Sequence, residues 1–243
     1  MSASASDREH ALREAVVATA REMNVLGINR GKSGNVSARL AHDGFSRYLI
    51  TPTGLPYAET RAEDIVAMPM AGDESAAAGT RLPSSEWRFH RDIYAARPEI
   101  AAIVHTHAPF ATTLACLDRG IPPFHYMIAM AGGFDIRCAP YATFGTQALS
   151  DAALRALEGR MACLLGQHGQ IALGKTPEKA FWLATEVETL ARLYVQALPL
   201  GEPPVLDDAE MARVIAQMER MSYGMGPEPD GSADAARPRQ GAQ

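Results

Sequence analysis

The segment Ala101-Ala102-Ile103-Val104-His105-Thr106-His107 joins an apolar run to a pair of histidines. The apolar run predicts a buried strand that ends at His105. Side chains two positions apart in a strand lie on the same side, so the rings of His105 and His107 can reach one metal ion while Thr106 faces away. A solvated strand end would have the same spacing, and the pair alone favours neither interpretation.

Two distant residues favour the metal site. Glu86 lies upstream, directly after Ser84-Ser85, and His168 lies downstream between two short apolar runs. Three imidazoles and one carboxylate form a ligand set suited to Zn²⁺, with one weakly held position left for chemistry. The sequence therefore predicts a zinc site in which these two residues join His105 and His107.

Apolar runs and turn residues on both sides of the central strand predict one domain that mixes strands and helices. We expect strands at 35–40, 47–51, 65–70, 101–105, 162–165 and 170–173, and helices at 9–26, 85–97, 109–117, 151–157, 177–197 and 207–221. Ser84 or Ser85 is expected to cap the second of these helices and Ser150 the fourth. Because strands and helices do not alternate regularly, we expect an α/β, α+β-like layered fold with a central, largely antiparallel sheet flanked by helices. Residues 1–223 would form this domain, and 224–243, rich in Gly, Pro, Ala and Asp, would be a disordered tail.

Composition narrows the class of function. The chain has 243 residues, enough for one substantial core, and a net charge of -5, which provides no basic surface for nucleic acid or an anionic membrane. No apolar stretch has the length of a membrane span, and the first residues lack the pattern of a signal peptide. We therefore expect a cytoplasmic protein that acts on a small molecule. Its three widely spaced cysteines fit reduced thiols better than disulfides or a cysteine zinc site.

Three small polar clusters could hold an anion: Ser33-Gly34-Asn35, Thr51-Pro52-Thr53-Gly54 and Ser84-Ser85. Glycine lets backbone N–H groups approach a phosphate, hydroxyls add donors, and a helix start adds partial positive charge, so no lysine is required. Each cluster alone is more often a turn or a cap. Because Ser85 directly precedes Glu86, a phosphate bound there would lie close to a substrate on the metal.

With these motifs the sequence resembles the class II aldolase/adducin family, and within it the L-fuculose-1-phosphate aldolase type. The resemblance covers about residues 11–223. It is strongest in the segments Gly34-Asn35-Val36-Ser37, Thr51-Pro52-Thr53-Gly54, Ser84-Ser85-Glu86, His105-Thr106-His107, 125–129, 139–146 and His168-Gly169.

The resemblance assigns roles to individual residues. It implies that His105, His107 and His168 bind one zinc ion per subunit, with Glu86 as fourth ligand in the resting enzyme and as catalytic acid/base. It implies that the substrate phosphate is held by Gly34, Asn35, Thr53, Gly54, Ser84 and Ser85. Tyr126 would be a proton donor supplied by the neighbouring subunit of a homotetramer, and Phe144 and Tyr223 would line the aldehyde end of the pocket.

The implied activity is a zinc-dependent cleavage of a ketose 1-phosphate, deoxygenated at its far end, into dihydroxyacetone phosphate and an aldehyde. Breaking the C3–C4 bond leaves an enediolate whose charge needs an electrophile, while a carboxylate and a phenol can manage the protons. Candidate substrates are L-fuculose 1-phosphate, giving lactaldehyde, 5-deoxyribulose 1-phosphate, giving acetaldehyde, and 5-methylthioribulose 1-phosphate, giving methylthioacetaldehyde.

Two alternatives remain open from the sequence. One is another enzyme on the same fold, a pentulose-phosphate 4-epimerase or a methylthioribulose-1-phosphate dehydratase. Glu86 argues against the epimerase, because such enzymes typically carry aspartate there and lack the run around Tyr126. The other is an adducin-like module without metal, which the retention of all four ligands disfavours. His90, one helical turn after Glu86, is expected to face solvent.

Overall fold

The structure, a computed structural model, describes residues 4–221 except 41–43, 45, 73–74 and 76. A seven-stranded sheet runs through this part of the chain in the order β3-β2-β1-β4-β7-β6-β5. Its strands are β1 (Asn35–Arg39), β2 (Arg47–Ile50), β3 (Val66–Pro69), β4 (Ala102–Thr106), β5 (Cys138–Ala139), β6 (Ala162–Leu165) and β7 (Gly169–Gly174). All neighbouring pairs are antiparallel except β5 and β6, so the expected largely antiparallel sheet is confirmed.

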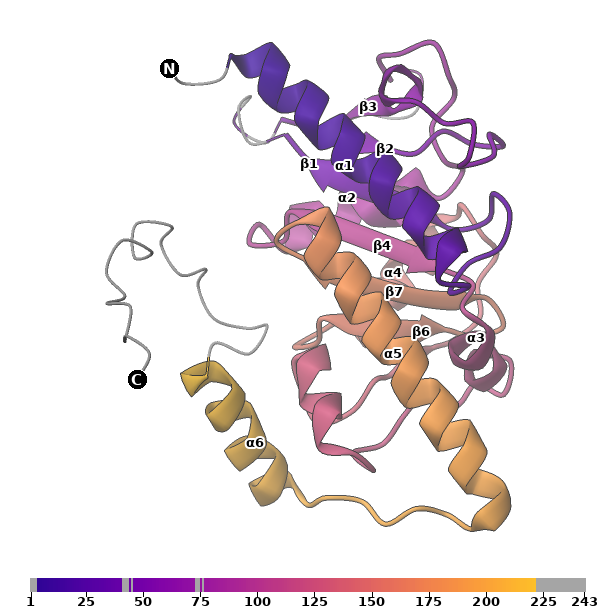
Figure 1. The fold of residues 1–243 in the computed structure, drawn as a ribbon, viewed down its shortest axis with the longest axis vertical. Helices are drawn as coiled ribbons and strands as arrows, with labels where there is room; N and C mark the ends of the chain where they lie inside the picture. The colour runs from indigo at the N-terminus through magenta and orange to yellow at the C-terminus, as the bar shows by residue number, and fades with distance from the viewer. Residues whose placement is uncertain (1–3, 41–43, 45, 73–74, 76, 222–243) are drawn as a thin grey trace, which may run out of the picture.

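Helices cover both faces of the sheet. Packing against one face are α1 (Ala5–Val25), α3 (Pro109–Ala115) and α5 (Pro177–Ala197), and Figure 1 shows α1 and α5 crossing in front of the strands. On the other face lie α2 (Trp87–Ala96) and α4 (Gln147–Ala156). Strand β4 lies between these two layers and all five of its residues are buried, which explains its continuous apolar run.

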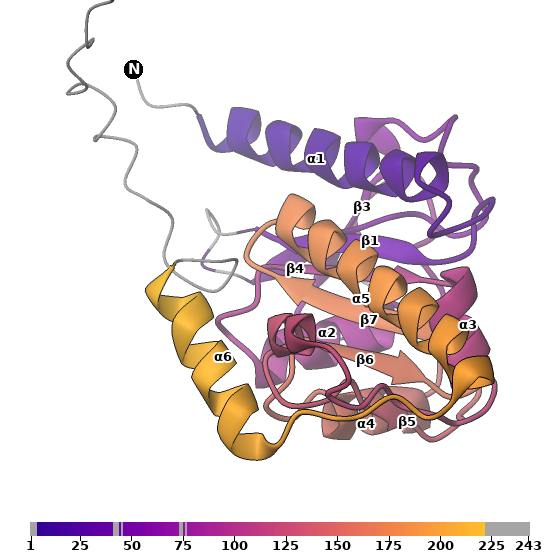
Figure 2. The ribbon, with the colours of Figure 1, turned by 60° about the horizontal axis from the view of Figure 1, so that its bottom comes forward.

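The remaining helical elements lie at the edges. Short 3₁₀ helices include η2 (Ala62–Asp64), η4 (Tyr126–Ala131) and η5 (Leu198–Leu200), and α6 (Asp208–Arg220) is the last helix of the described residues. Figure 2 shows α6 at the end of the extended segment that follows α5, and there it packs against η4 with Met211 buried in the core. None of the helices in the described residues combines the length and hydropathy needed to span a membrane.

Some expected boundaries were wrong. Helix α4 begins at Gln147, where the Oγ of Thr146 accepts a hydrogen bond from the Leu149 amide. Ser150 is therefore not a cap; it lies inside the helix, fully buried, and its hydroxyl donates to Asp92 Oδ2 at 2.7 Å. Helix α2 begins at Trp87 without a side-chain cap, so neither Ser84 nor Ser85 has that role. The expected disordered tail, 224–243, lies outside the described residues.

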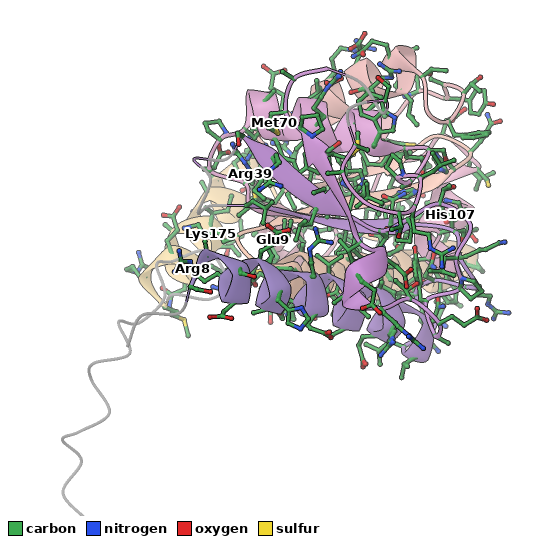
Figure 3. The ribbon with its side chains drawn as sticks, turned by 90° about the horizontal axis from the view of Figure 1, so that it is seen from above. Arg8, Glu9, Arg39, Met70, His107 and Lys175 are labelled. Carbon is green, nitrogen blue, oxygen red and sulfur yellow. The ribbon has the colours of Figure 1, made fainter. Side chains whose placement is uncertain are left out.

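The antiparallel register brings the ends of three strands together at one edge of the sheet. Asn35 at the start of β1 lies opposite His105 near the end of β4, and Gln170 in β7 lies opposite Thr106. Seen from above, His107 lies at the edge of the molecule opposite Arg39 and Lys175 (Figure 3). Residues that are distant in sequence thus meet beyond the end of β4.

Candidate metal-binding and active site

Four donor groups converge beyond the end of β4. The Nε2 atoms of His105 and His168 each lie 3.2 Å from an oxygen of the Glu86 carboxylate, and His107 Nε2 lies 3.1 Å from His105 Nε2. The ligand atoms of the three histidines all lie within 4.8 Å of one another. The three rings meet nearly edge to face, at 69–74°, so their nitrogens point toward one shared position. The structure therefore brings together all four residues that were expected to bind metal.

Strand alternation and a tight turn hold these side chains in place. His105 points to the α2 side of the sheet, where its ring meets Phe89, while Thr106 points to the α5 side and accepts a hydrogen bond from Gln170. His168 lies in the turn between β6 and β7. Gly169 ends this turn, and a Cβ there would lie 2.4 Å from the Thr106 carbonyl oxygen and 3.0 Å from the His107 ring. Only glycine allows the turn to approach the end of β4 so closely.

The protonation of the cluster suits a metal ion. His105 Nδ1 lies 2.8 Å from the carbonyl oxygen of Gln170, which can only accept, so Nδ1 carries a proton and Nε2 is the ring nitrogen that faces the cluster. Burial and neighbouring histidines lower the pKa of His107 to about 4, and burial first and then His105 lower that of His168 to about 4, so both rings are neutral at neutral pH.

Glu86 supplies the negative charge. Burial alone would raise its pKa, but the imidazoles of His105 and His168 and the amide of Asn35 outweigh burial and lower it to about 2. Its Oε1 atom is buried and accepts no hydrogen bond from the described residues. An ionised carboxylate with an unsatisfied oxygen, beside three imidazoles, is the arrangement that a bound cation would complete.

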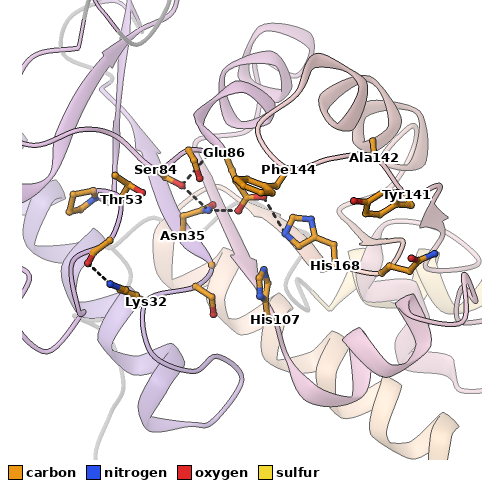
Figure 4. A pocket seen from close by; sticks show the side chains of 16 residues that line it. Lys32, Asn35, Thr53, Ser84, Glu86, His107, Tyr141, Ala142, Phe144 and His168 are labelled. Carbon is orange, nitrogen blue, oxygen red and sulfur yellow. Dashed lines mark hydrogen bonds and ion pairs between the residues drawn. The ribbon is translucent and has the colours of Figure 1, made fainter.

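A cavity of about 370 Å³ adjoins the cluster (Figure 4). All six residues expected to hold a phosphate line it: Gly34, Asn35, Thr53, Gly54, Ser84 and Ser85. Both glycines have positive φ, +69° and +72°, and a Cβ on Gly34 would lie 2.6 Å from the His105 carbonyl oxygen. The polar wall and the candidate metal ligands Glu86, His107 and His168 thus share one cavity.

Several residues of this cavity were missed at the sequence level. Lys32 lines the wall, with its ammonium group donating to the Gly54 carbonyl oxygen at 3.0 Å, although the sequence argument required no lysine. Its position directly before Ser33-Gly34-Asn35 was the available signal. Tyr141 and Gln167 also line the cavity, and Gln167 holds the unusual φ of +54° beside His168.

The outer residues of the expected site are placed differently. Phe144 lines the cavity with its side chain 64% exposed. Tyr126 does not line this cavity; it begins η4, is 52% exposed, and borders a second hollow formed with α6. Within one chain the structure therefore does not bring Tyr126 to the histidine cluster. Tyr223 lies outside the described residues.

His90 was expected to face solvent, and this expectation was wrong. Its side chain is fully buried between α2 and the sheet. Nδ1 lies 2.7 Å from the hydroxyl of Ser37, and Nε2 lies against Oδ1 of Asn35. A lone histidine one turn after Glu86 gives no indication of these partners, because both lie more than fifty residues earlier in the chain.

Comparison with known proteins agrees with this arrangement. The sequence profile described as "Class II Aldolase and Adducin N-terminal domain" matches residues 14–195. The chain belongs to the class II aldolase and adducin family. The resemblance inferred from its motifs is thereby confirmed, and class II aldolases depend on a metal ion, which the three-histidine cluster could hold.

Relatives that are about half identical to this chain in sequence are named aldolases. Aldolases are carbon–carbon lyases, and the chain belongs with them. It is 53% identical over 214 residues to the 5-methylthioribulose-1-phosphate/5-deoxyribulose-1-phosphate aldolase of Rhodospirillum rubrum, covering 88% of this chain and 93% of that protein. It is 48% identical over 211 residues to the L-fuculose phosphate aldolase of Escherichia coli K12, covering 86% and 94%. A solved structure of an L-fuculose 1-phosphate aldolase superposes with a TM-score of 0.81 at 38% identity, covering 86% of this chain and 96% of the other.

Proposed function

We propose that this protein is a zinc-dependent aldolase that cleaves a ketose 1-phosphate into dihydroxyacetone phosphate and an aldehyde. The observation that carries the proposal is one cavity lined both by three members of the cluster, Glu86, His107 and His168, and by a wall of hydroxyls and positive-φ glycines. Metal ligands beside an anion-binding wall match a substrate that carries both vicinal oxygens and a phosphate.

Zinc fits the cluster better than a hard cation does. His107 and His168 offer neutral imidazole nitrogens, His105 offers its Nε2, and Glu86 offers an ionised oxygen. Three nitrogens and one oxygen are typical of catalytic zinc, whereas Mg²⁺ and Ca²⁺ favour all-oxygen sites. A bound Zn²⁺ would supply the electrophile that stabilises the negative charge developing as the C3–C4 bond breaks.

The chain's own residues would divide the remaining tasks. Gly34, Gly54 and the neighbouring hydroxyls would hold the phosphate through backbone N–H groups and side-chain donors, with Lys32 adding positive charge. Anchoring the phosphate would place the reacting carbons next to Glu86. Its carboxylate, adjacent to the histidine cluster, would be the acid/base that moves a proton at those carbons.

A second proton carrier is needed at the C4 oxygen, which becomes a carbonyl during cleavage. We assign this role to Tyr126 of a neighbouring subunit, because in its own chain it is exposed and lies away from the cavity. The active protein would then be a homotetramer with sites at its subunit interfaces, working in the cytoplasm. Phe144, exposed on the cavity wall, would contact the aldehyde part of the substrate together with Tyr223.

The choice of substrate can be tested by comparing three ketose 1-phosphates. The relatives' names point to 5-methylthioribulose 1-phosphate, 5-deoxyribulose 1-phosphate and L-fuculose 1-phosphate, and the first two belong to the 53% identical relative. We propose these two as the better substrates. The test measures dihydroxyacetone phosphate release by zinc-loaded protein from each compound, with Glu86→Gln protein as control. Epimerised or dehydrated product without dihydroxyacetone phosphate would refute the proposal.

A further inference from the structure

A chain of buried hydrogen bonds lies behind the cavity and ends on Glu86. Tyr94 Oη lies 2.7 Å from Ser37 Oγ, and Ser37 Oγ lies 2.7 Å from His90 Nδ1. On its other side, His90 Nε2 contacts Asn35 Oδ1, and Asn35 Nδ2 donates to Glu86 Oε2 at 2.9 Å. All five residues are at least 94% buried, so water does not compete for these bonds.

The chain of hydrogen bonds follows from the side-chain periodicity of two elements that face each other, β1 and α2. Asn35 and Ser37 are two residues apart in β1 and therefore point to the same side of the sheet. Glu86, His90 and Tyr94 are spaced by four along the start and body of α2, so they share one helix face. Where these two rows meet, each strand residue lies between two helix residues.

The direction of every bond can be assigned from the Glu86 end. The amide nitrogen of Asn35 donates to Glu86 Oε2, so Asn35 presents its Oδ1 to His90. Oδ1 only accepts, so His90 carries a proton on Nε2. Burial lowers the pKa of His90 to about 3, and the neutral ring leaves Nδ1 bare to accept from Ser37. Because the hydroxyl proton of Ser37 is donated to His90 Nδ1, its oxygen is left to accept a hydrogen bond from the Tyr94 hydroxyl.

We propose that His90 is a positioning residue for catalysis: its Nε2–H holds the Asn35 amide with the nitrogen toward Glu86. One carboxylate oxygen is thereby fixed by a donor while the other, Oε1, remains free toward the metal and substrate. Without the His90 proton, the Asn35 amide can turn over. Its oxygen would then face Glu86 Oε2, and repulsion between two acceptors would displace the carboxylate. The inference rests on the proposed role of Glu86 as acid/base.

The first test measures which ring nitrogen of His90 carries the proton in the native protein. Zinc-loaded protein labelled with ¹⁵N in its histidines is studied by long-range ¹H–¹⁵N correlation, and the His90 signals are identified by their loss in His90→Gln protein. The expected result is one proton on Nε2 and a bare Nδ1 at neutral pH. A proton on Nδ1, or protons on both nitrogens, would overturn the assigned direction. This result does not depend on catalytic activity, so it stands apart from any failure of the proposed function.

The second test measures whether the chain of hydrogen bonds affects turnover. His90→Leu removes the donor at similar size, whereas the amide nitrogen of Gln in His90→Gln can still donate to Asn35. We expect kcat to fall about tenfold or more for Leu and to stay within about threefold for Gln, although both lose thermal stability. Tyr48→Phe is the matched control, because it removes a buried hydroxyl that donates to the Trp87 carbonyl in the same core but outside the chain.

The pattern of kcat values separates positioning from mere packing. A structural role would lower kcat in proportion to lost stability in His90→Leu, His90→Gln and Tyr48→Phe alike. Equal kcat in His90→Leu and His90→Gln, each corrected for folded fraction, would overturn the positioning role. If Glu86→Gln protein keeps its activity, the proposed function fails instead, while the tautomer of His90 remains as measured.

Discussion

Replacing Gly169 with Ala should separate the metal ligands without removing any of them. The added Cβ would lie 2.4 Å from the Thr106 carbonyl oxygen, which is backbone and cannot rotate away. An ordinary carbon–oxygen contact needs about 3.3 Å, so the His168 turn and the end of β4 must move apart by about 0.9 Å. The same shift relieves the 3.0 Å approach to the His107 ring. His168 would therefore lose its place relative to His105 and His107.

The expected magnitudes follow from these distances. Overpacking of this kind costs about 1–3 kcal/mol of unfolding free energy, and a displacement near 1 Å in a catalytic array costs about a hundredfold in turnover. Zinc affinity, measured by competition with a chromophoric chelator, should fall together with kcat. The control is Gly159→Ala, at a φ of +65° with no atom within 4 Å of the new Cβ, which introduces backbone strain away from the ligands.

The comparison of the two glycine variants is decisive. We expect Gly159→Ala protein to lose some stability but to keep its zinc affinity and its kcat. If Gly169→Ala protein binds zinc and turns over substrate like the wild type, the close approach of the turn to β4 does not determine the geometry of the site, and the reasoning fails.

Three further predictions concern the phosphate wall, the neighbouring subunit and pH. Lys32→Met should raise KM for a ketose 1-phosphate about tenfold while changing KM for the unphosphorylated ketose little; equal effects on both would remove Lys32 from phosphate binding. Mixing inactive Glu86→Gln with inactive Tyr126→Phe chains under subunit exchange should restore part of the activity, and no recovery despite exchange would exclude a role for Tyr126 in a neighbouring site. In metal-free protein, the pKa of His107 and of His168 is lowered to about 4 from 6.5, so the unfolded chain binds protons that the folded chain does not. Stability should therefore fall as pH drops from about 6.5 toward 4, and urea midpoints that do not change over this range would contradict the assignment.

Local pattern was sufficient to predict the elements that position the site. The apolar run before His105 predicted β4, and alternation correctly placed Thr106 on the face opposite the histidine ring. Glycine and hydroxyl clusters in three separate turns were expected near the metal, and the structure lines one cavity with them. The strand and its alternation could be predicted because they depend on residues that are close in sequence, whereas the meeting of the three clusters beside the histidines was implied by the family resemblance.

Predictions failed where the deciding partner is distant in sequence. Ser150 has the residue type of a cap, but Asp92 on another helix provides its partner. His90 resembles a surface histidine until β1 places Ser37 and Asn35 against it. The two-residue strand β5 is too short to leave a periodic pattern, and it exists only because β6 pairs with it. Tertiary contacts of this kind are not readable from local spacing.

Because Asn35 in β1 pairs with His105 in β4, the candidate active site forms only when these two strands are correctly aligned. Side chains in a strand alternate, so a shift of β1 by one residue would bring Val36 opposite His105 and turn Asn35 to the other face of the sheet. A molecule so misaligned would keep its secondary structure and much of its apolar burial, but its carboxylate would lose the amide donor and its cavity would lose a polar wall. Turnover per chain would thus report the fraction of molecules in a preparation whose strands are correctly aligned, which neither circular dichroism nor solubility can do.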